Sequence, residues 1–116
     1  MQYSNTMASS GEIRLIIKGL VERLLAEYSP SKVILFGSHA YGNPGPHSDI
    51  DLLIIKDTTE RFIDRWVTVR RILSDPGRRV PIETIVLTPG EVAARLAAGD
   101  QFVKEIMTRG EVLHDA

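Results

Sequence analysis

The sequence contains no cysteine, so disulfide bonds, thiolate metal sites and cysteine nucleophiles are all excluded. It also lacks an excess of basic residues, because 14 lysines and arginines face 15 acidic residues and the formal net charge is −1. Proteins that bind nucleic acid or membrane surfaces nonspecifically usually carry such an excess, and we expect neither partner here. No apolar run approaches the ~20 residues that span a bilayer, and residues 1–11 lack the apolar core of a signal peptide. We therefore expect a cytoplasmic protein.

The residues that are present suit a single domain. The chain has 116 residues, of which 43% are hydrophobic and 25% charged, and this size allows one core but not two. Residues 1–10 are mostly polar and are interpreted as a disordered tail. Residues 11–116 are then expected to form the whole folded domain, and no internal repeat divides them.

Hydrophobic periodicity and turn residues predict the order helix, strand, strand, helix, strand, helix, helix, with a short edge strand last. Ser9 and Glu12 have the spacing of a capping box, and apolar residues recur at helical spacing from there to Ser29. The later predicted elements are strands over residues 33–36, 50–55 and 82–87, a helix that ends before residues 75–77, helices over 89–99 and about 100–109, and an edge strand at 112–113. This pattern predicts an α/β (α+β) fold, a small mixed β-sheet with helices packed on it.

Two features of the helices can be tested directly against a structure. Asp57 and Glu60 are placed to cap the middle helix, and Thr88 and Glu91 have capping-box spacing around a proline at the first helical position of the next one. The expected buried face of the middle helix consists of Phe62, Ile63, Trp66, Val69, Ile72 and Leu73.

Two acids stand at the start of the second predicted strand. Asp49 and Asp51 flank Ile50, and residues 52–55 are all apolar. Residues two apart in a strand point to the same face of the sheet, so the two carboxylates project together. Carboxylates held this close repel each other unless a cation lies between them. Magnesium commonly takes one or two carboxylates together with phosphate oxygens, and we expect this pair to bind it.

Gly37 and Ser38 end the preceding predicted strand. A glycine there lets the backbone turn sharply and lets a ligand approach closely. If a short helix follows, its first amides favour an anion, and the Ser38 hydroxyl adds a donor. A phosphate-binding turn beside a pair of metal-binding acids is the arrangement that nucleotidyl transfer needs.

Glu83 is the candidate for a third acid. It interrupts the strand-like run of residues 81–87, where a charge is costly unless it lies at the sheet surface or is paired. If this strand lies beside the second one, Glu83 can reach the metal or take a proton from an attacking hydroxyl. The alternative is a solvent-facing acid on an edge strand.

The pattern Gly37-Ser38, ten residues, Asp49-Ile50-Asp51 resembles the signature of the minimal nucleotidyltransferase (MNT) family in the DNA polymerase β superfamily. The resemblance covers roughly residues 15–113. It implies that Gly37 and Ser38 bind phosphate and that Asp49 and Asp51 bind metal. Glu83 falls where the family commonly has an aspartate, and His39 falls where arginine is frequent, beside the phosphate turn.

The resemblance extends to MNT antitoxins that are encoded beside HEPN ribonuclease toxins. It implies a nucleoside triphosphate substrate, two magnesium ions, and transfer of AMP from ATP onto a tyrosine of the partner toxin. Assembly with the toxin or with further copies of the chain stays open.

Two other functions compete with this one. A binding module could neutralise its partner by steric cover alone, with the acids vestigial. A transferase could instead act on a small molecule or on RNA, although relatives of that kind usually carry an extra acceptor domain. His39 and Tyr41 follow the phosphate turn and are equally consistent with nucleotide contact and with an exposed loop. Four arginines near the end of the middle helix are interpreted as a solvated face with favourable helix-end charge: Arg70, Arg71, Arg78 and Arg79.

Overall fold

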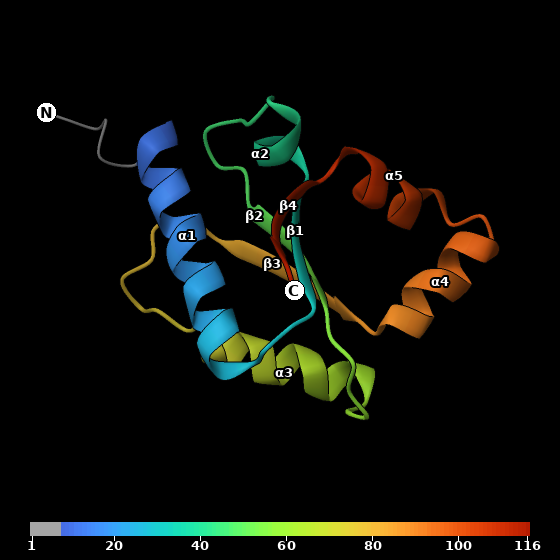
Figure 1. Ribbon diagram of the computed structural model, residues 1–116. Helices are drawn as coiled ribbons and strands as arrows, with labels where there is room; N and C mark the ends of the chain where they lie inside the picture. The colour runs from blue at the N-terminus through green and yellow to red at the C-terminus, as the bar shows by residue number, and fades with distance from the viewer. Residues whose placement is uncertain (1–7) are drawn as a thin grey trace, which may run out of the picture.

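The computed structural model describes residues 8–116 (Figure 1). Its elements in chain order are α1 (Ser10–Glu27), β1 (Lys32–Phe36), α2 (Ser38–Tyr41), β2 (Ile50–Ile55), α3 (Phe62–Ile72), β3 (Ile82–Leu87), α4 (Pro89–Ala97), α5 (Gln101–Arg109) and β4 (Glu111–Asp115). The predicted order and the mixed α/β class are confirmed. Of the predicted tail, residues 1–7 lie outside the described residues, whereas Ser9 caps α1 and Ala8 packs against the core.

The four strands form one mixed sheet in the order β3-β2-β1-β4. β1 pairs antiparallel with both β2 and β4, and β2 pairs parallel with β3. A parallel pair needs a crossover connection, and α3 supplies it between β2 and β3. The predicted edge strand at residues 112–113 is therefore confirmed as part of β4.

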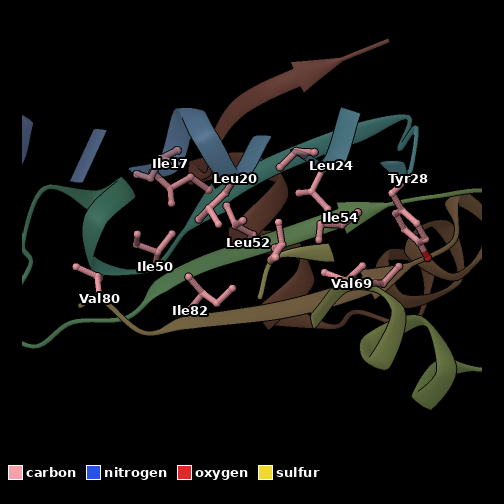
Figure 2. Close-up of a cluster of buried hydrophobic side chains, with 14 of the residues drawn as sticks. Ile17, Leu20, Leu24, Tyr28, Ile50, Leu52, Ile54, Val69, Val80 and Ile82 are labelled. Carbon is pink, nitrogen blue, oxygen red and sulfur yellow. The ribbon is translucent and has the colours of Figure 1, made fainter. Parts of the chain in front are cut away.

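Helices lie on both sides of the sheet, α1 and α3 on one side and α4 and α5 on the other (Figure 1). We call these sides the α1/α3 face and the α4/α5 face. Alternate residues of β2 divide between them, because Leu52 and Ile54 belong to the core under α1 and α3 while Leu53 and Ile55 belong to the core under α4 and α5. Figure 2 shows the α1/α3 core, where Leu20 and other α1 side chains meet those of β2, β3 and α3.

Helix starts follow the expected capping chemistry. The Ser9 hydroxyl accepts from the Glu12 amide and the Glu12 carboxylate accepts from the Ser9 amide. Thr88 and Glu91 form the same reciprocal box at α4. Each box satisfies two amides that the first helical turn leaves without a partner, and these two helix starts were readable from sequence for that reason. No helix in the described part of the chain has the length and apolar character needed to cross a membrane.

The prediction for α3 is wrong in two respects. Its N-cap is Arg61, without a side-chain cap bond, so neither Asp57 nor Glu60 caps it. The second half of the expected buried face is confirmed by Val69 and Leu73, which are fully buried. Its first half is wrong, because Phe62, Ile63 and Trp66 are 52%, 58% and 42% exposed.

The buried face of α3 is instead built around Arg65, which is 6% exposed and lies on the same side as Val69 and Leu73. The Arg65 guanidinium donates to the Glu60 carbonyl at 2.8 Å and to both carboxylate oxygens of Glu91 at 2.6 and 3.2 Å. An arginine can be buried when its charge is paired and its donors are satisfied. A pattern that counts apolar residues cannot detect such a position.

Candidate active site

Two of the three predicted acids, Asp51 and Glu83, lie in register on neighbouring strands, and the third, Asp49, lies just before one of them. Asp49 immediately precedes β2, and Asp51 is its second residue. Asp51 pairs in register with Glu83 on the parallel strand β3 and with Phe36 on β1. Phe36, Asp51 and Glu83 therefore form a row across three strands, on the α4/α5 face. The conditional prediction that the third strand lies beside the second is confirmed, and Glu83 shares the face of Asp51.

The carboxylates of this row influence one another. The pKa of Asp51 is raised to about 6, first by burial and then by the charges of Asp49 and Glu83, while His39 opposes the rise. Asp51 is half-buried and Glu83 is exposed. The cost of placing negative charge at Asp51 is thus partly electrostatic, and a cation bound there would remove it.

Gly37 is in direct contact with Asp51. Its φ of 76° lies in the left-handed region, which a side chain would strain. A Cβ built on Gly37 would also lie only 2.1 Å from Oδ2 of Asp51. The turn after β1 and the acid of β2 therefore meet at a point where only glycine fits.

Ser38 begins α2, a single turn that ends at Gly42 in the left-handed conformation. The Gly37 carbonyl accepts from the amides of Ala40 and Tyr41. The first amides of a helix have no partner within the helix, and Ser38 directly follows Gly37, whose Cβ position lies against Asp51.

His39 is held against the loop that leads into β2. Its Nε2 lies 3.1 Å from the Ser48 carbonyl oxygen, to which an Nε2–H can donate. Tyr41 is half-buried, and the Arg109 guanidinium stacks over its ring at 4.1 Å from the centroid. The contact between Tyr41 and α5 was not visible in the sequence.

The sequence matches the protein family described as "Nucleotidyltransferase domain" over residues 17–106. The chain belongs to this nucleotidyltransferase family. A comparison with curated protein sequences gives no match.

Solved structures share the fold of this nucleotidyltransferase domain. One is a candidate nucleotidyltransferase from Sulfolobus solfataricus, with a TM-score of 0.64, 23% identity, and coverage of 93% of this chain and 89% of that chain. Another is a mutant form of the toxin–antitoxin pair MntA-HpeT, with a TM-score of 0.54, 19% identity, and coverage of 86% of this chain and 72% of that chain.

The chemistry of the acids in this nucleotidyltransferase domain suits a hard divalent cation. Within residues 8–116, no three histidine, aspartate or glutamate side chains lie close enough together to hold one metal ion. The three acids therefore do not form a complete three-ligand site by themselves. Magnesium usually takes only one or two protein carboxylates and completes its shell with phosphate and water oxygens. Asp49 and Asp51 are near enough for the charge of Asp49 to raise the pKa of Asp51, and such a pair could supply the carboxylates that magnesium takes.

A cavity of about 700 Å³ lies on the other side of His39, between the start of α1, the loop before β2 and the segment before β3. His39, His47 and Arg79 line it, and none of the three acids does. The acid row of the nucleotidyltransferase domain instead lies at the start of β2 and β3, on the α4/α5 face.

The arginines near the end of α3 make contacts with the protein. Arg78 donates to the Leu73 carbonyl at the C-cap of α3, Arg70 donates to the Ile82 carbonyl at 2.7 Å, and Arg79 pairs with Glu12 at 2.9 Å. The bond from Arg78 fits the predicted helix-end charge, whereas the tertiary contacts of Arg70 and Arg79 were missed.

Proposed function

We propose that this domain transfers AMP from ATP to a protein hydroxyl, a tyrosine of a HEPN-type toxin, and thereby acts as an antitoxin. The observation that carries the proposal is the contact between Gly37 and Asp51. It joins a turn suited to phosphate to an acid suited to metal, and membership of the nucleotidyltransferase family supports the same chemistry.

In this proposal Gly37, Ser38 and His39 bind the triphosphate. The Gly37 backbone allows close approach, and the Ser38 hydroxyl donates a hydrogen bond. His39 is near enough to Asp51 to act on its pKa, and its imidazole is the proposed third contact to the phosphates.

Asp49, Asp51 and Glu83 are the proposed metal ligands and catalytic acids. Two magnesium ions bound there would neutralise the phosphate charge and stabilise the attacking and leaving oxygens. Asp49 and Asp51 would hold the cations that bind the triphosphate, and Glu83 accepts the proton of the attacking hydroxyl. A bond forms between that oxygen and the α-phosphorus, the bond from the α-phosphorus to the bridging oxygen breaks, and pyrophosphate leaves.

The proposed partner is a HEPN-type toxin in the cytoplasm, where ATP and magnesium are available. The fold shared with the MntA-HpeT pair supports this choice. Complexes of this chain with the toxin, or with further copies of itself, are compatible with the proposal.

Incubation of the full chain with magnesium, each labelled nucleoside triphosphate in turn and the candidate toxin tests the proposal. We expect label to appear on the toxin from α-labelled ATP, and a toxin whose acceptor tyrosine is replaced by phenylalanine to stay unlabelled. Label on neither protein from any of the four nucleotides would contradict it.

A steric antitoxin is the second candidate, and it is favoured by the exposure of Glu83 and by the lack of a complete three-ligand site in the described residues. The same experiment separates the two functions. A domain that neutralises the toxin equally well without magnesium or nucleotide acts by steric cover.

A further inference from the structure

Phe36 and Phe102 form an aromatic pair next to Asp51, on the side away from Glu83. Phe36 lies opposite Asp51 on the neighbouring strand, and its ring contacts that of Phe102 edge to face, with centroids 5.7 Å apart and planes at 87°. Phe36 is 8% exposed, whereas Phe102 is 49% exposed. About half of the Phe102 surface is therefore open, on the same face of the sheet as the acids.

Phe102 is held in place by more than this contact. It lies in the first turn of α5, where Asp100 caps the helix by accepting from the Val103 amide at 3.1 Å. The adjacent Val103 and the later Ile106 are fully buried against β1 and β2. A ring anchored by its helix and by an edge contact loses little conformational freedom when a flat ligand stacks on it.

The position of this ring fits the dimensions of a nucleotide. Neighbouring strands are about 4.7–4.9 Å apart, and Phe36 pairs with Asp51 on one side and contacts the Phe102 ring on the other. With the triphosphate at Gly37 and Ser38, the nucleoside can extend toward Glu83 on the edge strand or toward Phe36 and Phe102. The second direction offers a flat apolar surface, the exposed half of the Phe102 ring.

We propose that Phe102, supported by Phe36, is the surface on which the base of the bound nucleotide stacks. This inference rests on the proposed nucleotidyl transfer. Stacking depends on the area of the flat ring and not on its hydrogen-bonding edge. This contact therefore favours purine over pyrimidine nucleotides and does not distinguish adenine from guanine.

Titration calorimetry of the full chain with magnesium and two ligands, ATP and inorganic tripolyphosphate, tests the inference. For Phe102→Ala we expect ATP affinity to fall by about 5- to 150-fold, the usual range for loss of one aromatic stack. Tripolyphosphate has no base, so its affinity should be unchanged. Phe102→Trp should retain ATP binding, because the flat surface is kept.

Phe62→Ala is the matched control. Phe62 is 52% exposed, close to the 49% of Phe102, but it lies on α3 at the other side of the sheet. It should change neither affinity. Equal ATP affinity for wild type and Phe102→Ala would overturn the inference, as would an equal loss of both ligands, which would indicate a structural effect.

These outcomes are distinguishable from failure of the proposed function. A wild-type chain that binds neither ligand would contradict nucleotidyl transfer and the stacking site together. A wild-type chain that binds and transfers AMP, with Phe102→Ala unchanged, would contradict the stacking site alone.

A fluorescence experiment gives a second, structural readout. Trp66 is the single tryptophan of the sequence, so Phe102→Trp in a Trp66→Phe background carries one reporter. Quenching by ATP but not by tripolyphosphate is expected from a base that lies on the ring. Equal quenching by both ligands, or by neither, would contradict stacking.

Discussion

At the scale of single residues, Gly37 is the point where the two recognisable motifs meet. In the sequence, Gly37-Ser38 and Asp49-x-Asp51 form one spaced signature, and strand alternation predicts that Asp49 and Asp51 project to the same face. A Cβ added at position 37 would lie 2.1 Å from the Asp51 carboxylate, and this closeness depends on the pairing of β1 with β2. Sequence spacing alone could not have shown it.

Gly37→Ala should therefore reduce stability and nucleotide binding by more than backbone strain at a positive φ alone would cause. Strain of this kind costs about 1–3 kcal/mol of folding free energy, and the added methyl must also displace the Asp51 carboxylate. Gly42→Ala is the control, since Gly42 has a φ of 82° but nothing within 4 Å of its Cβ position. Chemical denaturation and ATP titration of both variants should show a larger loss for Gly37→Ala, in nucleotide binding above all. Equal losses would mean that the contact with Asp51 is unimportant.

Asp51→Asn should stabilise the metal-free protein at neutral pH. The folded-state pKa of Asp51, about 6, lies above the ordinary value near 3.9. A raised carboxyl pKa favours the folded state below the unfolded pKa, and this advantage is lost as pH rises through the folded pKa. The variant should gain on the order of 1 kcal/mol at pH 7.5, after allowance for solvent screening, and nothing below pH 4.

Thermal unfolding of the wild type and of Asp51→Asn in EDTA, at pH 7.5 and below pH 4, measures this difference in stability. The exposed Asp57→Asn serves as a control for the general effect of removing one negative charge. A variant that is no more stable than wild type at pH 7.5 would contradict the electrostatic description of the acid row.

Glu83→Gln tests the third acid. We expect the rate of transfer to fall by about 10²- to 10⁴-fold, as for loss of a general base. ATP affinity should stay the same, because Asp49, Asp51 and the phosphate turn remain. Single-turnover rates and equilibrium titration separate the two quantities. A variant with the wild-type rate would make Glu83 an ordinary exposed acid of an edge strand.

At the scale of elements, features that depend on neighbouring residues could be predicted from the sequence, whereas features that depend on distant residues could not. Strand β2 and the capping boxes of α1 and α4 were predicted because their signals lie within a few neighbouring residues. The buried side of α3 was mispredicted because its central residue, Arg65, is satisfied by Glu91, 26 residues further along the chain. Glu91 thus both caps α4 and pairs with α3.

Glu91→Gln should isolate the ion pair from the cap. The amide oxygen can still accept from the Thr88 amide, but the charge that balances the buried Arg65 is lost. Breaking a fully buried pair costs about 3–5 kcal/mol, and because Glu91 is partly exposed we expect about 1–3 kcal/mol. The pKa of Glu91 lies below its ordinary value, chiefly because of the hydrogen bond from Arg65. The stability that the ion pair contributes should therefore disappear as the pH falls through this lowered pKa.

Urea denaturation measures the effect at neutral and acidic pH. Glu105→Gln is the matched control, because the Arg109–Glu105 pair of 3.2 Å lies on an exposed helix surface. Exposed pairs contribute about 0–1 kcal/mol. Equal effects of the two substitutions would mean that Arg65 does not depend on Glu91.

At the scale of the whole molecule, the order of the strands in the sheet brings the candidate site residues together. The order β3-β2-β1-β4 sets Glu83, Asp51 and Phe36 side by side, with α5 over β1. The mixed sheet was predicted from the sequence. The neighbouring position of the second and third strands was the condition for a role of Glu83, and the pairing of β2 with β3 meets it. The packing of Phe102 on Phe36 was not predicted, because it joins an ordinary helical residue to a strand far away in the chain.

The most direct test of nucleotidyl transfer compares ATP labelled on the α-phosphate with ATP labelled on the γ-phosphate, using the wild-type chain, magnesium and the toxin. Our account predicts label on the toxin from α-labelled ATP only, and none when Asp49→Asn replaces the wild type. Label from γ-labelled ATP, or undiminished α-label with Asp49→Asn, would contradict it.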